Sequence, residues 1–278
     1  MRNWLKNKYV VLSGASGGIG RELCKILIET YGANVIGIGR NQDKMLSLKT
    51  ELGVNADKFS YYLFDVSQKE NWVTLREDLK TKNLAIALLI NNAGMFPIFQ
   101  KTENTSPDTI QRIMETNFLS VTYAIENLSP VLKGDEKHKP DIVNVCSSAA
   151  LCTIAGTSAY SASKAALKAY TEALQLETKD KYIGIVYPGT TATDLFRNDE
   201  HTKNSALDII AMPAQKMAKK IARKILKKRK RAVVGWDAKL MNLTAKFMPV
   251  KGTALIAWVM KISKSKVFEE VFDYKKKK

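Results

Sequence analysis

Histidine and cysteine are scarce in this chain, and their scarcity excludes several kinds of site. The only two histidines, His138 and His201, lie in polar stretches and are expected at the surface. Without a cluster of Cys and His side chains we predict no metal site, and a Ser-His-Asp hydrolase is disfavoured. The cysteines form no CxxC pair, which indicates buried free thiols in a reducing compartment rather than a disulfide scaffold. They are Cys24, Cys146 and Cys152.

Long apolar runs are also missing. No stretch reaches the roughly 18 uninterrupted apolar residues that a membrane-spanning helix needs. Residues 1–9 are basic and lead into a strand-like run without the apolar core of a signal peptide. The protein is therefore predicted to be cytoplasmic, which leaves peripheral attachment to a membrane surface open.

Acidic residues are few relative to basic ones. The 278 residues include 27 Asp and Glu against 44 Lys and Arg, so the formal net charge is +17. Such a field favours an anionic partner: a phosphorylated cofactor, an acidic membrane surface or nucleic acid. Nucleic acid is not expected, because no recognition motif accompanies the charge.

Short apolar runs alternate with helical patterns along residues 1–235. This alternation predicts βαβ units and a parallel sheet, and runs that are apolar almost throughout indicate helices on both faces. We therefore predict an α/β fold with a doubly wound parallel sheet of about seven strands in a single domain, residues 1–235. The predicted strands are residues 9–12, 34–38, 59–64, 85–90, 141–145, 182–187 and 232–234.

A basic, apolar C-terminal extension, residues 236–278, follows this domain. Its apolar stretch, residues 240–262, carries scattered lysines and is broken by Pro249 and Gly252. The combination suits a segment lying in the interface of an anionic membrane. A subunit interface and a lid over the substrate pocket are the alternatives. Upstream, residues 217–226 form an amphipathic helix that is expected to pack its apolar stripe on the sheet.

The first predicted strand runs directly into a glycine-rich loop, SGASGGIG at residues 13–20. In a strand–turn–helix context such a loop binds phosphates at the helix N-terminus. Gly14 permits the tight turn, Gly18 lets the backbone approach a pyrophosphate, and Gly20 lets helix and strand pack closely. The alternative interpretation is a purely structural turn.

Arg40 ends the second predicted strand, where a site selective for NAD would place an acid. An arginine suits the 2′-phosphate of NADP, so NADP(H) is the predicted cofactor, and Arg21 could add a second positive charge. The alternative for each arginine is a solvated surface residue. Asp65, after the third strand, either accepts a hydrogen bond from the adenine amino group or caps the next helix.

Tyr160 and Lys164 lie four positions apart in a helical stretch and share one face of it. A nearby ammonium lowers the pKa of a phenol, which otherwise titrates near about 10, so the pair can exchange a proton with a carbonyl or alcohol. Ser147 ends the fifth strand, where its hydroxyl can hold the substrate oxygen. Asn117 lies in a predicted helix, residues 110–123, and is either simply tolerated there or marks a local distortion.

Two further segments follow predicted strands: NNAG at residues 91–94 and YPGTTAT at residues 187–193. Both can be plain turns. The threonines of the second segment either bond a nicotinamide amide or cap the next element. In this order and spacing, the segments resemble the classical short-chain dehydrogenase/reductase family over about residues 7–235. The resemblance implies a Rossmann fold and hydride transfer between NADP(H) and a ketone or secondary alcohol.

The resemblance also implies a role for each residue. Tyr160 is the general acid/base, and Lys164 lowers its pKa and holds the nicotinamide ribose. Ser147 positions the substrate oxygen, and Asn117 supports a water-linked proton relay to Lys164. The implied cofactor contacts are Gly14, Ser16, Gly18, Ile19, Gly20, Arg40, Asp65, Asn91, Tyr160, Lys164 and Thr193.

Two positions depart from the family pattern: Ser13, where threonine is usual, and Cys146, where many members have serine. Residues 194–212 mix apolar and charged side chains and are expected to form a mobile lid with an apolar lining. A lipophilic, steroid- or lipid-like ketone or alcohol is therefore expected as the small-molecule substrate, and a homo-oligomer as the assembly. The alternative is a non-catalytic NADP-binding sensor or scaffold on the same fold.

Overall fold

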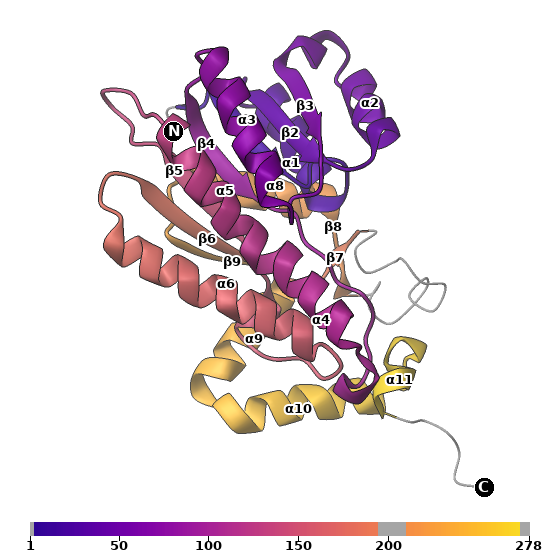
Figure 1. Cartoon of the computed structure of the whole chain (residues 1–278). Helices are drawn as coiled ribbons and strands as arrows, with labels where there is room; N and C mark the ends of the chain where they lie inside the picture. The colour runs from indigo at the N-terminus through magenta and orange to yellow at the C-terminus, as the bar shows by residue number, and fades with distance from the viewer. Residues whose placement is uncertain (1–2, 194–209, 273–278) are drawn as a thin grey trace, which may run out of the picture.

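A seven-stranded parallel sheet forms the centre of the computed structural model, which describes residues 3–193 and 210–272 (Figure 1). The strand order is β3-β2-β1-β4-β5-β6-β9. Each of the seven predicted strands forms, with its ends within one residue of the prediction, so the doubly wound Rossmann architecture is confirmed. The strands are β1 (Tyr9–Ser13), β2 (Asn34–Gly39), β3 (Phe59–Leu63), β4 (Ile86–Asn91), β5 (Asp141–Val145), β6 (Tyr182–Pro188) and β9 (Arg231–Val234).

The strand order reverses between β1 and β4, which lie side by side although β2 and β3 separate them in the chain. In open parallel sheets, ligands bind beyond the carboxyl ends of the strands at such a reversal. The glycine-rich loop follows β1, the NNAG segment includes the last residue of β4, and Ser147 follows β5. The topology therefore brings the predicted site segments to one edge of the sheet.

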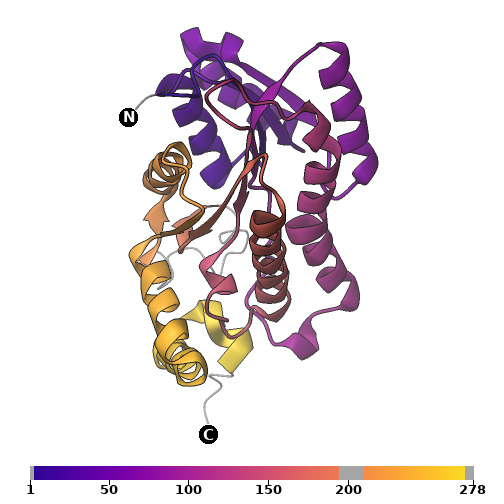
Figure 2. The ribbon, with the colours of Figure 1, turned by 90° about the vertical axis from the view of Figure 1, so that its left-hand side faces the viewer.

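Helices cover both faces of the sheet, which explains why its strands are apolar almost throughout (Figures 1 and 2). One core cluster joins the sheet to α1 (Gly18–Glu29), α2 (Gln42–Glu51) and α8 (Ala214–Leu226). A second joins the other face to α3 (Lys69–Thr81), α5 (Ser120–Leu128) and α6 (Ser158–Glu177). Shorter elements are α4 (Pro107–Met114), a π-helix (Glu115–Leu119) and 3-10 turns at Gly53–Lys58, Thr102–Asn104, Ser129–Val131, Ser148–Ala150 and Lys266–Phe268.

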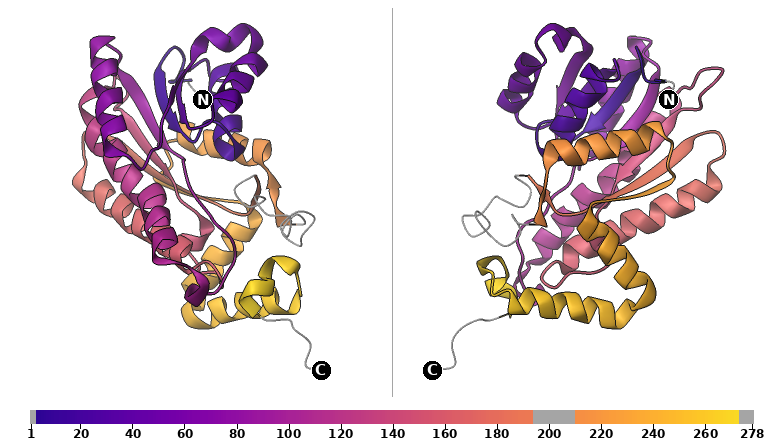
Figure 3. Two further views of the ribbon diagram at one scale, coloured as in Figure 1. Left: turned by 45° about the vertical axis from the view of Figure 1, so that its right-hand side comes forward. Right: turned by 180° about the vertical axis from the view of Figure 1, so that it is seen from behind.

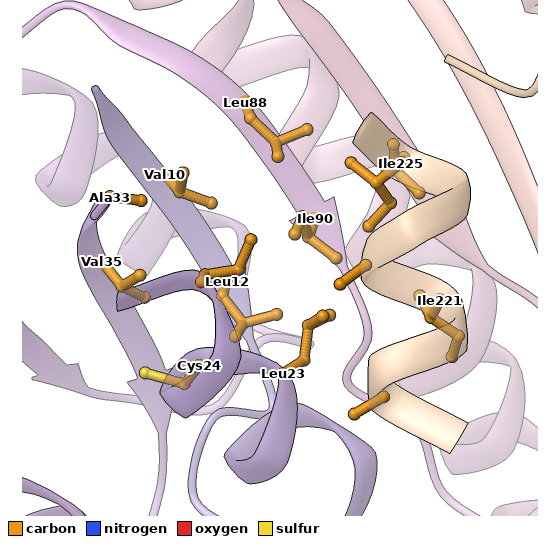
Figure 4. Packing of buried hydrophobic residues seen from close by; sticks show 14 of the residues in the cluster. Val10, Leu12, Leu23, Cys24, Ala33, Val35, Leu88, Ile90, Ile221 and Ile225 are labelled. Atoms are coloured by element: carbon orange, nitrogen blue, oxygen red, sulfur yellow. The ribbon is translucent and has the colours of Figure 1, made fainter. Parts of the chain in front are cut away.

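Helix α8 packs its apolar stripe on the sheet, as its pattern predicts. Ile221 and Ile225 are almost completely buried and lie against Leu23 of α1 and Ile90 of β4 (Figure 4). The basic side chains of the helix occupy its other face, so its positive charge stays in solvent.

The C-terminal extension forms three helices, α9 (Trp236–Phe247), α10 (Pro249–Ile262) and α11 (Glu269–Phe272). The apolar stretch breaks at Met248, and Pro249 begins α10 as proline at a first helical position often does. Gly252, predicted to be a second breaker, lies within α10. A Cβ there would stand 2.4 Å from Thr244 Cγ2, so glycine serves the close packing of α10 on α9.

Several sequence predictions have a different or untested outcome. His138 is partly exposed, with its ring 5.9 Å from that of Trp4, so it lies at the surface as predicted. All three cysteines are free and buried, as expected. The predicted lid lies mostly outside the described residues, as does His201. Its ends are joined by an unpredicted parallel pair, β7 (Thr191–Ala192) with β8 (Met212–Pro213). Within the described ranges no helix is long and apolar enough to span a bilayer.

Removing the buried methyl groups of α8 tests the packing of this helix. We expect Ile221→Ala to lower the free energy of unfolding by about 2–5 kcal/mol, because it leaves a cavity against α1 and the sheet. Leu176→Ala is the control: Leu176 is 82% exposed on α6, so its truncation should change stability by no more than about 0.5 kcal/mol. Urea denaturation measures both. Similar values for the two variants would contradict the packing described.

Candidate active site

The glycine-rich loop closes tightly between β1 and α1. Gly14 and Gly18 have φ of +71° and +53°, a region that glycine adopts without strain. A Cβ on Gly20 would stand 2.0 Å from the Gly14 carbonyl oxygen, so no larger residue fits between loop and helix. No side chain caps the first N–H groups of α1, and its first turn holds no acid. This uncapped helix N-terminus behind a glycine turn fits a pyrophosphate.

Ser13 joins this loop to the NNAG segment. Its hydroxyl oxygen accepts hydrogen bonds from the backbone N–H groups of Asn92 and Ala93, both at 3.0 Å. The Asn92 amide in turn donates to the Ser13 carbonyl oxygen at 3.1 Å. The departure from threonine at this position therefore keeps the hydroxyl that ties the carboxyl ends of β1 and β4 together.

The side chain of Asn91 points into the fold. Its amide donates to Asn144 Oδ1 at 2.9 Å, and the Asn144 amide donates to Thr171 Oγ1, also at 2.9 Å. This buried chain of hydrogen bonds links β4, β5 and α6. The amide group of Asn91 thus already has a partner, and its contact with a cofactor stays a prediction.

Arg40 and Asp65 meet at the edge of the sheet beyond β2 and β3. Arg40 Nη1 lies 3.6 Å from Asp65 Oδ2, and the arginine side chain is 77% exposed. Asp65 Oδ1 accepts from both the N–H and the hydroxyl of Ser67, while the N-cap of α3 is Gln68, so Asp65 is not the helix cap. Partial burial raises the pKa of Asp65, but the Ser67 hydrogen bonds and Arg40 outweigh it and hold that pKa below its usual value.

Arg21 does not join Arg40, contrary to the sequence hypothesis. Its guanidinium pairs with Glu51 at 2.6 Å and donates to the Lys44 carbonyl oxygen at 2.9 Å, which fixes α1 to α2. Ser16, in contrast, lies close to the end of β2 that leads into Arg40, because a Cβ on Gly39 would stand 3.0 Å from Ser16 Oγ. A 2′-phosphate would therefore find one exposed arginine here, not two.

Tyr160 and Lys164 are buried on α6, with 6% and 3% of their surface exposed. Lys164 Nζ lies 5.9 Å from the centre of the Tyr160 ring. Among the described residues, the ammonium makes one hydrogen bond, a long one of 3.4 Å to the Val145 carbonyl oxygen. A buried ammonium has three donors, so this site still has room for hydroxyl acceptors such as those of a ribose. Ser147, just after β5, lies near enough to the Tyr160 hydroxyl to lower the pKa of that phenol.

Burial controls the protonation of this pair. It raises the pKa of Tyr160 to about 12; the neighbouring Ser147 hydroxyl offsets part of the rise, and the nearby Cys146 side chain adds to it. Burial also lowers the pKa of Lys164. Lys164 is not among the groups that shift the Tyr160 pKa. Without a cofactor the phenol is therefore held protonated, as a proton donor must be.

Asn117 lies at the centre of the π-helix between α4 and α5, which confirms a local distortion at this residue. It is completely buried. Its Oδ1 accepts from the Met95 N–H at 2.7 Å, and its amide donates to the Met95 carbonyl oxygen at 2.9 Å and to Ser163 Oγ at 3.0 Å. A Cβ on Gly94 would stand 3.3 Å from Asn117 Oδ1 and 3.5 Å from Lys164 Nζ. The side chains of Asn117 and Lys164 therefore both lie next to Gly94 of the NNAG segment.

The segment after β6 reaches back to the glycine loop. Thr193 faces Gly18, since a Cβ on that glycine would stand 3.0 Å from Thr193 Cγ2. The backbone N–H of Thr190 donates to Asp237 Oδ2 at 2.5 Å, and a Cβ on Gly189 would collide with the same carboxylate. Asp237, in the first turn of α9, was not predicted as a site residue. Its position three residues after a predicted strand was the only available signal.

A wall of apolar side chains borders Tyr160 and was not predicted. The Phe96 and Tyr160 rings meet edge to face at 5.1 Å, and the Phe99 and Phe268 rings pack the same way, also at 5.1 Å. Met260 of α10 completes the cluster. The C-terminal extension therefore contributes directly to the surroundings of the candidate catalytic residue.

Two other features bear on where the site lies. Among residues 3–193 and 210–272, no three His, Cys, Asp or Glu side chains come together as a metal site would require. A hollow of about 410 Å³ lies at the opposite, amino-terminal edge of β1–β3, between Tyr9, Asn34 and Tyr61. None of the predicted site residues lines this hollow, so it belongs to another part of the molecule.

Comparison with known proteins agrees with this geometry. A family model described as short chain dehydrogenase matches residues 8–204. The 3-ketodihydrosphingosine reductase of Bos taurus is 30% identical over 261 residues, which are 88% of this chain and 77% of the relative. The inactive hydroxysteroid dehydrogenase-like protein 1 of Pongo abelii is 28% identical over 253 residues, 87% and 72% of the two chains.

Among solved structures, a short chain dehydrogenase from Burkholderia cenocepacia in complex with NADP superimposes with a TM-score of 0.75 at 22% identity. The match covers 91% of this chain and 98% of that one, and at this identity it shows the fold. The family model spans more than half of the chain and includes the loop, the serine and the Tyr–Lys pair. The chain therefore belongs to the short-chain dehydrogenase family of oxidoreductases.

Proposed function

We propose that this protein interconverts a lipophilic ketone and its secondary alcohol with NADP(H) as the cofactor. The observation that carries the proposal is the buried Tyr160, which lies near Ser147 and beside Lys164 and is bordered by an apolar wall. A proton donor, a positioning hydroxyl and an apolar surround are what the reduction of an apolar ketone needs.

The residues act on the substrate oxygen in the direction of reduction. Ser147 donates a hydrogen bond to the carbonyl oxygen and holds it beside the phenol. Tyr160, protonated because burial raises its pKa to about 12, gives its proton to that oxygen as negative charge develops. Lys164 holds the ribose hydroxyls with its remaining donors, and Asn117 supports a proton path to Lys164. A bound nicotinamide supplies the hydride.

Selection of NADP over NAD rests on Arg40. Its exposed guanidinium carries the donors that match a phosphate in pairs. Asp65, which lies against it, is engaged by Ser67 and by Arg40 itself. The uncapped N-terminus of α1 takes the pyrophosphate, with Gly14, Ser16, Gly18, Ile19 and Gly20 around it.

The apolar wall favours a lipid-like substrate. Phe96, Phe99 and Phe268 offer ring surfaces rather than hydrogen bonds, so selection there works through burial of apolar area. The relative from Bos taurus is named for a ketone on a long-chain lipid base, which is consistent with such a substrate. The expectation that this protein assembles as a homo-oligomer stays a prediction.

A second candidate function is a non-catalytic NADP-binding sensor or scaffold on the same fold. A relative of comparable coverage carries the word inactive in its name, so this family includes members without turnover. The complete set of Asn117, Ser147, Tyr160 and Lys164 favours the enzyme, because a sensor has no need of a buried acid/base pair.

Removing the phenol oxygen separates these two functions. We expect Tyr160→Phe to lower kcat for a panel of lipophilic ketones by about 10²–10⁴-fold, because the proton donor is lost. NADPH binding, followed by fluorescence titration, should persist. Tyr170→Phe on the same helix is the matched control and should keep wild-type turnover. Undiminished turnover in Tyr160→Phe would sink the assignment, and wild-type protein that binds NADPH without turning over any ketone would favour the sensor.

Removing the guanidinium tests the choice of cofactor. Arg40→Ala should weaken NADPH binding by about 10- to 100-fold, the value of a charge-assisted hydrogen-bond pair, and leave NADH binding unchanged. Arg76→Ala, on the far side of the sheet where Arg76 pairs with Glu77, should alter neither. Equal losses for NADPH and NADH in Arg40→Ala would mean that Arg40 does not read the 2′-phosphate.

A further inference from the structure

Helix α9 carries an apolar stripe that no described part of the protein covers. Four large apolar side chains recur at intervals of four, three and four residues, so they lie along one side of the helix. Amphipathic helices normally turn such a stripe toward the core. Here each member is more than half exposed: Trp236 58%, Leu240 54%, Leu243 53% and Phe247 69%.

The exposed surface continues onto α10. Gly252, Ile256 and Met260 face inward, toward α9 and the wall beside Tyr160. The opposite side of α10 and the corner between the helices expose further apolar side chains. Ten of the fifteen exposed large apolar side chains of the described residues belong to this surface, which we call the outer face: Trp236, Leu240, Leu243, Phe247, Met248, Val250, Leu255, Trp258, Val259 and Ile262.

Such a concentration of exposed apolar side chains is unusual on a protein surface that faces water. Exposed apolar residues are normally scattered singly, whereas contiguous patches mark sites of interaction. The outer face includes both exposed tryptophans of the described residues, while Trp4 and Trp72 are buried. The helices that carry it lie at one end of the molecule, where α9 leads away from the sheet into α10 (Figure 3). A large, flat partner can therefore reach it without obstruction from the described helices of the domain.

The charge on the same segment has a single sign. Residues 238–268 contain six lysines and no aspartate or glutamate. None of the six forms an ion pair with any residue that the structure describes. Their ammonium groups are thus free to meet anions that come from outside the chain. They are Lys239, Lys246, Lys251, Lys261, Lys264 and Lys266.

We propose that the outer face docks the protein on an anionic lipid bilayer. Its tryptophans, Phe247 and leucines enter the interface between headgroups and acyl chains, and the lysines contact the lipid phosphates. The mixture of exposed aromatic and aliphatic side chains with flanking lysines is what such an interfacial segment requires. Two joined helices lie flat on the surface, and neither crosses the bilayer.

A second copy of the chain fits this face less well than lipid does. A two-fold interface places the same surface of each copy against itself. Two sets of six unpaired lysines would then come together, with no acid in either segment to offset them. An anionic bilayer offers negative charge to the lysines at its surface and an apolar acyl-chain region to the exposed aromatic and aliphatic side chains.

Docking in this way has a consequence for the active site. Helix α10 separates the outer face from the apolar wall, because Met260 lies in the wall beside Tyr160 while Val259 is exposed on the outside. A lipid-like ketone leaving the bilayer would therefore meet the wall across the thickness of one helix. This consequence rests on the proposed function, whereas docking itself does not.

Vesicle co-sedimentation of the full chain tests the docking. We expect the protein to pellet with vesicles of phosphatidylcholine and phosphatidylserine, and far less with phosphatidylcholine alone. The double variant Val250→Asp/Leu255→Asp should bind the mixed vesicles about tenfold more weakly or worse, since burying a single leucine accounts for such a factor. Both side chains are exposed, so the variant should fold, which NADPH binding checks.

Val54→Asp/Leu176→Asp is the matched control. It makes the same two changes of residue type and charge at side chains that are 98% and 82% exposed elsewhere, and it should bind vesicles like the wild type. Equal losses in both double variants would overturn the proposal, because net charge alone would then explain them.

Tryptophan fluorescence with brominated lipids adds an independent measurement. Trp258 and Trp236 should be quenched on binding, and Trp258→Phe should remove part of that quenching while Trp4 and Trp72 stay protected in the core. Failure to bind mixed vesicles would overturn the proposal. So would a dimer in analytical ultracentrifugation that Val250→Asp/Leu255→Asp dissociates, if it forms without vesicle binding. Vesicle binding by a protein without ketone turnover would refute the proposed function and leave the docking intact.

Discussion

The close approach of the glycine loop to β4 is the constraint on which the rest of the site depends. Gly20 leaves no room for a Cβ beside the Gly14 carbonyl, and the Ser13 hydroxyl ties that turn to Asn92 and Ala93. Because β1 and β4 are neighbours at the reversal of strand order, this one junction aligns the two ends of the candidate site, the glycine-rich loop and the NNAG segment next to Lys164. A larger residue at Gly20 would push α1 away from the sheet, and the two ends of the site would separate.

The C-terminal extension serves the site from two directions. At its start, Asp237 accepts a hydrogen bond from the Thr190 N–H and so fixes the segment that brings Thr193 to the glycine loop. Further along, Met260 and Phe268 build the apolar wall beside Tyr160. The extension is therefore part of the active-site architecture rather than an appendage. An event on its outer face, such as the proposed docking on lipid, would act on helices that already contact both the segment after β6 and the apolar wall beside Tyr160.

Local sequence patterns were sufficient to predict the strands of the sheet and the candidate site residues at the strand ends. The run at residues 85–90 is apolar throughout and is followed by the polar Asn91 and Asn92, which is the pattern of a strand buried on both faces. The ends of parallel strands meet by topology, which is why Gly14, Arg40 and Ser147 could be grouped in advance. Contacts between segments that are distant in the sequence could not be predicted from such local patterns. Arg21 lies next to the glycine loop in sequence, but Glu51 of α2 holds it, and Phe268 reaches Phe99 across more than half the chain.

The protonation of Tyr160 shows most clearly why sequence alone was insufficient. Spacing on a helix predicts an ammonium beside a phenol, and from that a lowered pKa. The structure adds burial, which acts on the two groups in opposite directions: it raises the pKa of the phenol and lowers that of Lys164. Both shifts favour the neutral forms. Acceptors that bind the Lys164 donors would favour its ammonium again, and the charged ammonium would then stabilise the phenolate left after proton transfer. In the proposed function, cofactor binding at Lys164 and acid/base chemistry at Tyr160 would in this way be coupled through a single buried lysine.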